Sequence, residues 1–149
     1  MNISPATVSD IPELCELLEL LFSEEAEFHP NRAVQSEGLR QIMENPERGQ
    51  ILVLRNATSV IGMVNLLFTI STALGGRVAI LEDMVIHPAQ QGNGEGSRLL
   101  QAAINFARST QCRRITLLTD CTNESAQRFY RRHGFSLSPM IPLRLLLTG

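Results

Sequence analysis

A glycine-rich segment at residues 91–97, Gln-Gly-Asn-Gly-Glu-Gly-Ser, is the part of the chain that points most directly to chemistry. It follows a strand-like run and precedes a helix-like run. Because glycine has no Cβ atom, successive backbone N–H groups can turn toward one point. The first turn of the following helix adds unpaired N–H donors and the positive end of its dipole. We expect this loop to bind a phosphate or pyrophosphate, and a flexible turn before a helix is the alternative interpretation.

The types of basic residue in the chain exclude several kinds of phosphate-binding site. All thirteen are arginine, and the chain contains no lysine. A Gly-Lys-Ser/Thr phosphate-binding loop, a protein kinase and a pyridoxal Schiff base each need a lysine, so these are excluded. The glycine spacing, Gly-x-Gly-x-Gly, also differs from the dinucleotide-binding fingerprint. A nucleotide-binding domain of another type remains one hypothesis for this loop.

The elements around this loop predict a mixed α/β (α+β) sheet. Apolar residues at helical spacing predict helices near 11–22 and 34–43, one directly after the glycine loop, and one at 123–133. Asp10 looks like the cap of the first helix, with Glu13 completing a capping box. Strand-like runs occupy 2–7, 50–55, 59–69, 77–86 and 114–119, and two closing strands are expected at 135–138 and 140–147. The order predicts about six or seven mostly antiparallel strands with helices on both faces.

Composition is that of one ordinary globular domain. The chain has 149 residues, is 44% hydrophobic and 19% charged, and carries a formal net charge of −2. We expect a single domain over 1–149, with no nucleic acid as partner because the charge is mixed and slightly negative. The longest apolar run, 60–70, is too short to span a membrane. Three cysteines without close pairing indicate a reducing compartment, so we expect a cytoplasmic protein.

Three linked motifs resemble the GNAT superfamily of acyl-CoA-dependent N-acetyltransferases. Ile86-His87-Pro88 ends a strand and is followed by the glycine loop, which opens a helix. Asn123, Ala126 and Phe129-Tyr130 then precede Gly134-Phe135. The resemblance covers Ile80 to Phe135 by motif. It implies a single N-acetyltransferase domain with splayed fourth and fifth strands, acetyl-CoA as co-substrate and no metal.

The resemblance also implies roles for individual residues. The strand backbone would hold the pantetheine arm, the loop amides the pyrophosphate and an asparagine the amide arm, while Tyr130 would protonate the sulfur. The implied cofactor-binding residues are Met84, Val85, Ile86, Gln91, Gly92, Asn93, Gly94, Glu95, Gly96, Ser97, Asn123 and Tyr130. Glu95 departs from the family pattern, which has an aliphatic residue there. Since a carboxylate would repel the phosphates, we expect it to turn away or to pair with an arginine such as Arg98.

An amine must lose its proton before it attacks a thioester, because an alkylamine of pKa about 10.4 is mostly protonated at pH 7. Glu82 is our candidate base, and strand alternation is expected to send Asp83 to the opposite face. A surface or ion-paired role for Glu82 is the alternative. Cys112, Cys121 and the scattered histidines show neither nucleophile nor metal spacing.

The predicted activity is transfer of an acetyl group to a primary amine of a small molecule by direct attack. An acidic run around the end of the first helix, Glu24, Glu25 and Glu27, could attract a cationic amine, or could be a solvated charge run. The alternative function is a catalytically silent acyl-CoA-binding regulatory module, which Glu95 favours. A homodimer is compatible with the family, although no residue requires one.

Overall fold

The computed structural model describes residues 1–24 and 29–148. Its contacts divide the chain into two compact units, Met1–Leu118 and Thr119–Gly149. A single domain over 1–149 stays a prediction. The first unit contains β1 (Asn2–Pro5), η1 (Val8–Asp10), α1 (Ile11–Ser23), α2 (Arg32–Met43), β2 (Gly49–Arg55), β3 (Val60–Ser71), β4 (Gly76–Ile86), η2 (Pro88–Gln90), α3 (Glu95–Ser109) and β5 (Ile115–Leu117). The second unit contains α4 (Glu124–Arg132).

One mixed sheet organises the first unit, with its strands in the order β1-β2-β3-β4-β5. The first four strands pair antiparallel, whereas β4 and β5 pair parallel. The parallel pairing is short, running only from Ala79↔Ile115 to Leu81↔Leu117. The second half of β4 therefore continues beyond β5, as the predicted splay of the fourth and fifth strands requires.

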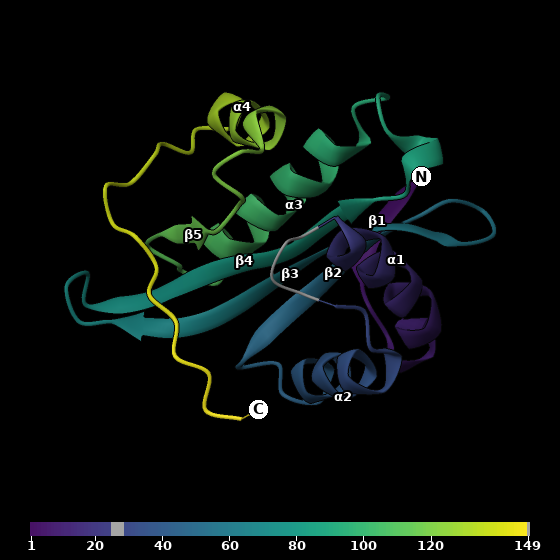
Figure 1. The fold of residues 1–149 in the computed structure, drawn as a ribbon, viewed down its shortest axis with the longest axis horizontal. Coiled ribbons are helices and arrows are strands. Elements are labelled where there is room, and N and C mark those ends of the chain that lie inside the picture. Colours follow the sequence, from purple (N-terminus) through teal and green to yellow (C-terminus); the bar gives the residue numbers. More distant parts are fainter. Residues whose placement is uncertain (25–28, 149) are drawn as a thin grey trace. The chain divides into compact units, whose positions relative to one another are not determined.

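The sheet has five strands in the described residues, so the prediction of six or seven was too high. The two expected closing strands, at 135–138 and 140–147, are irregular chain in the second unit (Figure 1). Their apolar side chains are exposed, and Leu143 keeps 90% of its surface. Pro139 and Pro142 remove two backbone donors from this stretch, which disfavours a strand ladder.

Helices cover both faces of the sheet in the first unit (Figure 1). On one face, α1 and α2 pack their apolar side chains on β2 and β3; this core contains Leu14, Cys15, Leu17, Leu18, Leu39, Ile51, Val53, Val60 and Met63. The other face carries α3, whose Phe106 ring stacks on Phe68 of β3 with 6.3 Å between centroids. These are the helical stripes that the sequence predicts. Among the described residues, no helix has the length and apolar character needed to cross a membrane.

Asp10 is the N-cap residue of α1, as predicted, but its side chain makes no capping hydrogen bond to that helix. The Thr7 backbone N–H donates to Asp10 Oδ2 at 2.8 Å, so the capping box is Thr7-x-x-Asp10 of η1, directly before α1, rather than Asp10-x-x-Glu13. The Glu13 carboxylate instead accepts from the Val60 backbone N–H, also at 2.8 Å. Asp10 is only 4% exposed and binds both terminal nitrogens of Arg55, at 2.7 and 2.5 Å. This pair joins the first helix to the end of β2.

We predict that Asp10→Asn lowers the free energy of unfolding by about 2–3 kcal/mol, because it leaves the partly buried Arg55 guanidinium without its bidentate acceptor. The Arg55 hydrogen bonds lower the pKa of Asp10. A lowered carboxyl pKa contributes stability that is complete above the unfolded pKa, about 3.9, and is lost as the pH falls through the folded value. Urea unfolding at pH 7 and at acidic pH measures both effects.

The matched control is Glu47→Gln, which removes one carboxylate from an exposed position. It should leave the urea midpoint at pH 7 almost unchanged. Equal midpoints for Asp10→Asn and Glu47→Gln would show that the pair contributes nothing.

Candidate functional site

Two glycines with positive φ shape the loop between η2 and α3. Gly92 has φ +88° and Gly94, the N-cap of α3, has φ +78°. A Cβ atom at either position would meet nothing within 4 Å. Glycine is therefore required by the backbone conformation, and the space beside both residues is open. This is the arrangement that allows a ligand to approach the backbone closely.

The amino end of α3 supplies the donors of this loop. The first bond of the helix ladder runs from the Arg98 N–H to the Gly94 carbonyl at 3.1 Å. The N–H groups of Glu95 and Gly96 come before that bond and have no acceptor within the helix. Because α3 has 15 residues, its dipole adds positive potential at the same point. The loop and the helix end can therefore bind an anion through backbone atoms alone.

Glu95 is paired with Arg98, as predicted. Its Oε2 accepts from Arg98 Nη1 at 2.7 Å, and its side chain is only 14% exposed. Arg98 also donates to the Met1 carbonyl at 3.3 Å. The guanidinium offsets the carboxylate charge that would repel a phosphate at the loop.

Gln91 anchors the loop to the end of β4, since its Nε2 donates to the Ile86 carbonyl at 2.9 Å. The backbone N–H of His87 donates to the Ile61 carbonyl at 2.7 Å, which holds the turn against β3. Leu81 is the last residue of β4 that pairs with β5, and Met84, Val85 and Ile86 follow it at the end of the strand. Their edge of β4 has no register partner in β5, which leaves strand backbone groups for a bound group to pair with.

A β-bulge interrupts β4 at Asp83, which has φ +55°. Met63 opposes Val85 and Asn65 opposes Glu82, so the single residue Val64 faces both Asp83 and Met84. Directly opposed residues share a face, which places Glu82 and Asn65 together. Asn65 Nδ2 also donates to Asp83 Oδ2 at 3.4 Å.

Side chains of β4 were expected to alternate between the two faces of the sheet. This alternation fails at Asp83, because the extra residue of the bulge shifts the following side chains by one position. Asp83 reaches the face that carries Asn65 and Glu82, instead of the opposite face. Glu82 itself is exposed, and Asp83 is half-buried. The site has two neighbouring carboxylates where the sequence analysis expected one.

Asn65 is a candidate site residue that the sequence analysis did not name. It is 1% exposed, and its Oδ1 has no hydrogen-bond partner among the described residues. Buried amide oxygens normally have a hydrogen-bond partner, so this unpaired oxygen next to the Asp83 carboxylate is a candidate acceptor for a bound molecule. The only signal in the sequence is an amide within the apolar run of β3.

The second unit holds the remaining two predicted site residues. Asn123 caps α4, and its Oδ1 accepts from the Ala126 N–H at 3.0 Å. Tyr130 makes edge-on ring contacts with Phe129 at 5.2 Å and with Phe135 at 5.6 Å. Burial raises the pKa of its phenol to about 12. The Tyr130 phenol is therefore protonated throughout the physiological range and keeps its proton available for a hydrogen bond.

Acidic side chains also line a hollow of about 440 Å³ beside α1, formed by Glu16, Glu19, Leu20, Ser23, Glu24 and Pro30. Glu25 and Glu27, the other members of the predicted acidic run, lie outside the described residues. Within the described ranges no group of three or more histidine, cysteine or acidic side chains could hold a metal ion. Cys15, Cys112 and Cys121 are free thiols.

Comparison with known proteins gives consistent results. The sequence profile described as "Acetyltransferase (GNAT) family" matches residues 11–135. An uncharacterized N-acetyltransferase of Bacillus subtilis (strain 168), YhfO, is 31% identical over 139 residues, covering 91% of this chain and 89% of that protein. The aminoalkylphosphonate N-acetyltransferase of Salmonella typhimurium (strain LT2) is 27% identical over 133 residues, covering 89% and 83%.

The fold has close structural neighbours as well. A putative acetyltransferase from Agrobacterium tumefaciens superposes with a TM-score of 0.82 at 23% identity, covering 97% of this chain and 100% of that one. At that identity the likeness supports the fold, while the profile match and the Bacillus relative support the family. The profile match over most of the chain and the identity with the Bacillus protein together show that this chain belongs to the acetyltransferase (GNAT) family.

Proposed function

We propose that this protein transfers the acetyl group of acetyl-CoA to the primary amine of a small molecule, by direct attack in a ternary complex. The observation that carries the proposal is the glycine loop: positive φ at Gly92 and Gly94, open space beside both, and the first N–H groups of α3 behind them. These features fit a diphosphate, which needs convergent backbone donors and close approach.

Acetyl-CoA, when bound, supplies the thioester that the amine attacks. Backbone donors from Gly92 to Ser97 would hold its diphosphate, and the edge of Met84, Val85 and Ile86 would pair with its amide arm. Asn123 remains a proposed contact to that arm through its Nδ2, since its Oδ1 caps α4. Gln91 acts indirectly, by holding the loop to Ile86.

Glu82 is the proposed base that takes the proton of the ammonium group, directly or through water. Its neighbour Asp83 shares the same face through the bulge and is held by Asn65. Two carboxylates side by side also attract a cationic amine before reaction. The paired carboxylates thus support both binding of the acceptor and removal of its proton.

Tyr130 is proposed to donate a hydrogen bond to the leaving sulfur. A phenol of pKa about 12 is a weak acid toward a thiolate whose conjugate thiol has a pKa of about 8.5, since complete proton transfer would be uphill by about 5 kcal/mol. A hydrogen bond that strengthens as charge develops on sulfur avoids this cost. The role of Tyr130 is therefore stabilisation of the leaving group more than complete proton delivery.

A small cationic amine is the proposed acceptor. The aminoalkylphosphonate N-acetyltransferase named above is the relative that supports a small molecule. The acidic hollow beside α1 supports a positive charge on it. We also propose that the protein is cytoplasmic and forms a homodimer.

The silent acyl-CoA-binding module is the second hypothesis, and it rested on Glu95. Pairing with Arg98 offsets that carboxylate within the loop and removes the main argument for weak cofactor binding. Thiol release from acetyl-CoA, measured against a panel of diamines, aminosugars and aminoalkylphosphonates, separates the two. Acetyl-CoA binding without acceptor-dependent release across the panel would favour the module.

We predict that Gly94→Ala weakens acetyl-CoA binding about tenfold or more, because a Cβ atom at φ +78° is strained and relaxation redirects the amides at the start of α3. Calorimetric titration measures the dissociation constant. Gly38→Ala is the matched control: Gly38 is exposed within α2, and a Cβ atom there meets nothing within 4 Å. Similar affinities for both variants would exclude the loop as the diphosphate site.

We predict that Glu82→Gln lowers kcat/KM about 100-fold or more, since a general base contributes factors of that size. The loss should shrink as the pH approaches the pKa of the acceptor amine, where free base is abundant. Initial rates from pH 6 to 10 measure this. Asp83→Asn is the comparison: if it shows the pH-dependent loss and Glu82→Gln does not, Asp83 is the base and our assignment is wrong.

For Tyr130→Phe we predict a fall in kcat of about 10- to 100-fold with little change in acetyl-CoA affinity, as expected for a lost hydrogen bond to a charged group. Because the raised pKa keeps the phenol protonated, the wild-type rate should show no decline below about pH 10 from Tyr130 ionisation. Stopped-flow or steady-state thiol release gives both quantities. Unchanged turnover in the Phe variant would remove Tyr130 from the mechanism.

A further inference from the structure

Gly62 of β3 lies beside the end of β4, where that strand turns toward the glycine loop. It is buried and directly opposes Ile86, the last residue of β4. An added Cβ atom at Gly62 would come within 2.6 Å of Ile86 Cδ1 and within 3.3 Å of the Val85 carbonyl oxygen. Carbon atoms in contact normally stay about 3.5–4.0 Å apart. The Ile86 side chain therefore occupies the space that a side chain at position 62 would fill.

The surroundings of Gly62 give the Ile86 side chain little room to move away. Ile86 is only 8% exposed. On the other neighbouring strand, β2, the fully buried Leu54 opposes Gly62, and its Cβ atom would already be at contact distance, 3.5 Å, from the added one. The Val85 oxygen is a main-chain atom and cannot rotate away. We therefore expect a methyl group at position 62 to displace the end of β4 itself, by up to about 1 Å.

The same end of β4 is tied to the glycine loop and to β3 by two hydrogen bonds. The Ile86 carbonyl accepts from Gln91 Nε2 at 2.9 Å, which anchors the loop. The next N–H along the chain, that of His87, donates to the carbonyl of Ile61 at 2.7 Å. Ile61 directly precedes Gly62 in β3. A shift of Ile86 thus strains both bonds together and moves the start of the loop relative to β3.

We propose that Gly62 is a positioning residue for the acetyl-CoA site. Because it has no side chain, Ile86 can pack across β3, and this packing fixes where the loop anchored by Gln91 begins. The inference rests on the proposed function, since the loop is the proposed diphosphate site. Small displacements matter at such a site, because backbone donors must converge on one group and a misplacement of about 1 Å can cost an enzyme about 100-fold.

The test is Gly62→Ala, with acetyl-CoA affinity measured by calorimetric titration. The dissociation constant should rise about fivefold or more, because the displaced loop no longer presents its donors correctly. Ile86→Val is the paired change, since it removes the Cδ1 atom that the new methyl group would meet. Together the two changes should raise the dissociation constant by less than the product of their separate effects. Effects that simply multiply would overturn the proposal.

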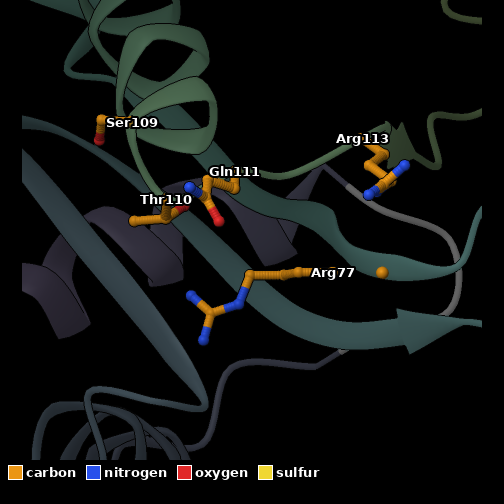
Figure 2. A pocket seen from close by; sticks show the side chains of 6 residues that line it. Arg77, Ser109, Thr110, Gln111 and Arg113 are labelled. Atoms are coloured by element: carbon orange, nitrogen blue, oxygen red, sulfur yellow. The ribbon is translucent and has the colours of Figure 1, made fainter.

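Two other crowded glycines in the sheet provide matched controls. Gly49 begins β2, and a Cβ atom there would come within 2.6 Å of the Leu66 carbonyl oxygen. Gly76 begins β4, at the end away from the loop, and its Cβ atom would come within 2.6 Å of Arg113 Nε. Gly76 and Arg113 line a hollow of about 490 Å³, around which Figure 2 shows the side chains of Arg113 and Arg77 pointing apart. The Arg113 side chain therefore has room to move.

Gly49→Ala should lower the urea midpoint at least as much as Gly62→Ala, because its obstacle is a main-chain atom, whereas Gly76→Ala should leave the midpoint almost unchanged. Both controls should bind acetyl-CoA as the wild type does. Equal weakening in Gly49→Ala and Gly62→Ala would show that lost stability, and not the position of the loop, is the cause, and the proposal would then be wrong.

The remaining outcomes separate this inference from the proposed function. A wild-type protein that does not bind acetyl-CoA contradicts the proposed function, whereas binding that is unchanged in Gly62→Ala contradicts only the role of Gly62. If Gly62→Ala alone is unfolded, the proposal requires that the double variant with Ile86→Val folds and binds acetyl-CoA. A double variant that is also unfolded would overturn it.

Discussion

The unequal pairing of β4 with its two neighbours is the constraint on which the site depends. β4 pairs with β3 almost along its length but with β5 only from Ala79 to Leu81. In a fully paired sheet, its inner backbone groups would be satisfied and closed to ligands. Because β5 ends early, the stretch from Met84 to Ile86 keeps one edge available, directly before the turn that leads to the glycine loop. The proposed binding of the acetyl-CoA amide arm depends on this opening.

The bulge at Asp83 lies in the pairing of β4 with its other neighbour, β3, and it changes which side chains share a face of the sheet. It adds one residue opposite Val64, so Glu82 and Asp83 reach one face together and Asn65 holds the latter. A left-handed aspartate in a strand costs conformational energy, and such strain persists where the surroundings enforce it. Here the neighbouring strand enforces it through regular pairing on both sides of the bulge.

Much of this arrangement was predictable because it follows from local patterns. The apolar stripes predicted α1 and α3, and the glycine spacing predicted the loop, since glycine adopts positive φ far more readily than other residues. Three features were not predictable, because each depends on a distant partner. Asp10 binds Arg55 across the fold, the bulge depends on the register with β3, and residues 135–147 have strand-like composition without a strand partner in the described chain. Alternation rules assume unbroken pairing, which is why Asp83 was assigned to the wrong face.

The absence of lysine bears directly on how the proposed diphosphate site can work. At the loop, a phosphate must be held by backbone donors, and the nearby Arg98 is already paired with Glu95. Backbone N–H groups carry no titratable charge, so a site based on them does not weaken as an ammonium group would when it is desolvated. The positive φ of Gly92 and Gly94 and the first turn of α3 therefore carry the role that a lysine has in other phosphate-binding loops.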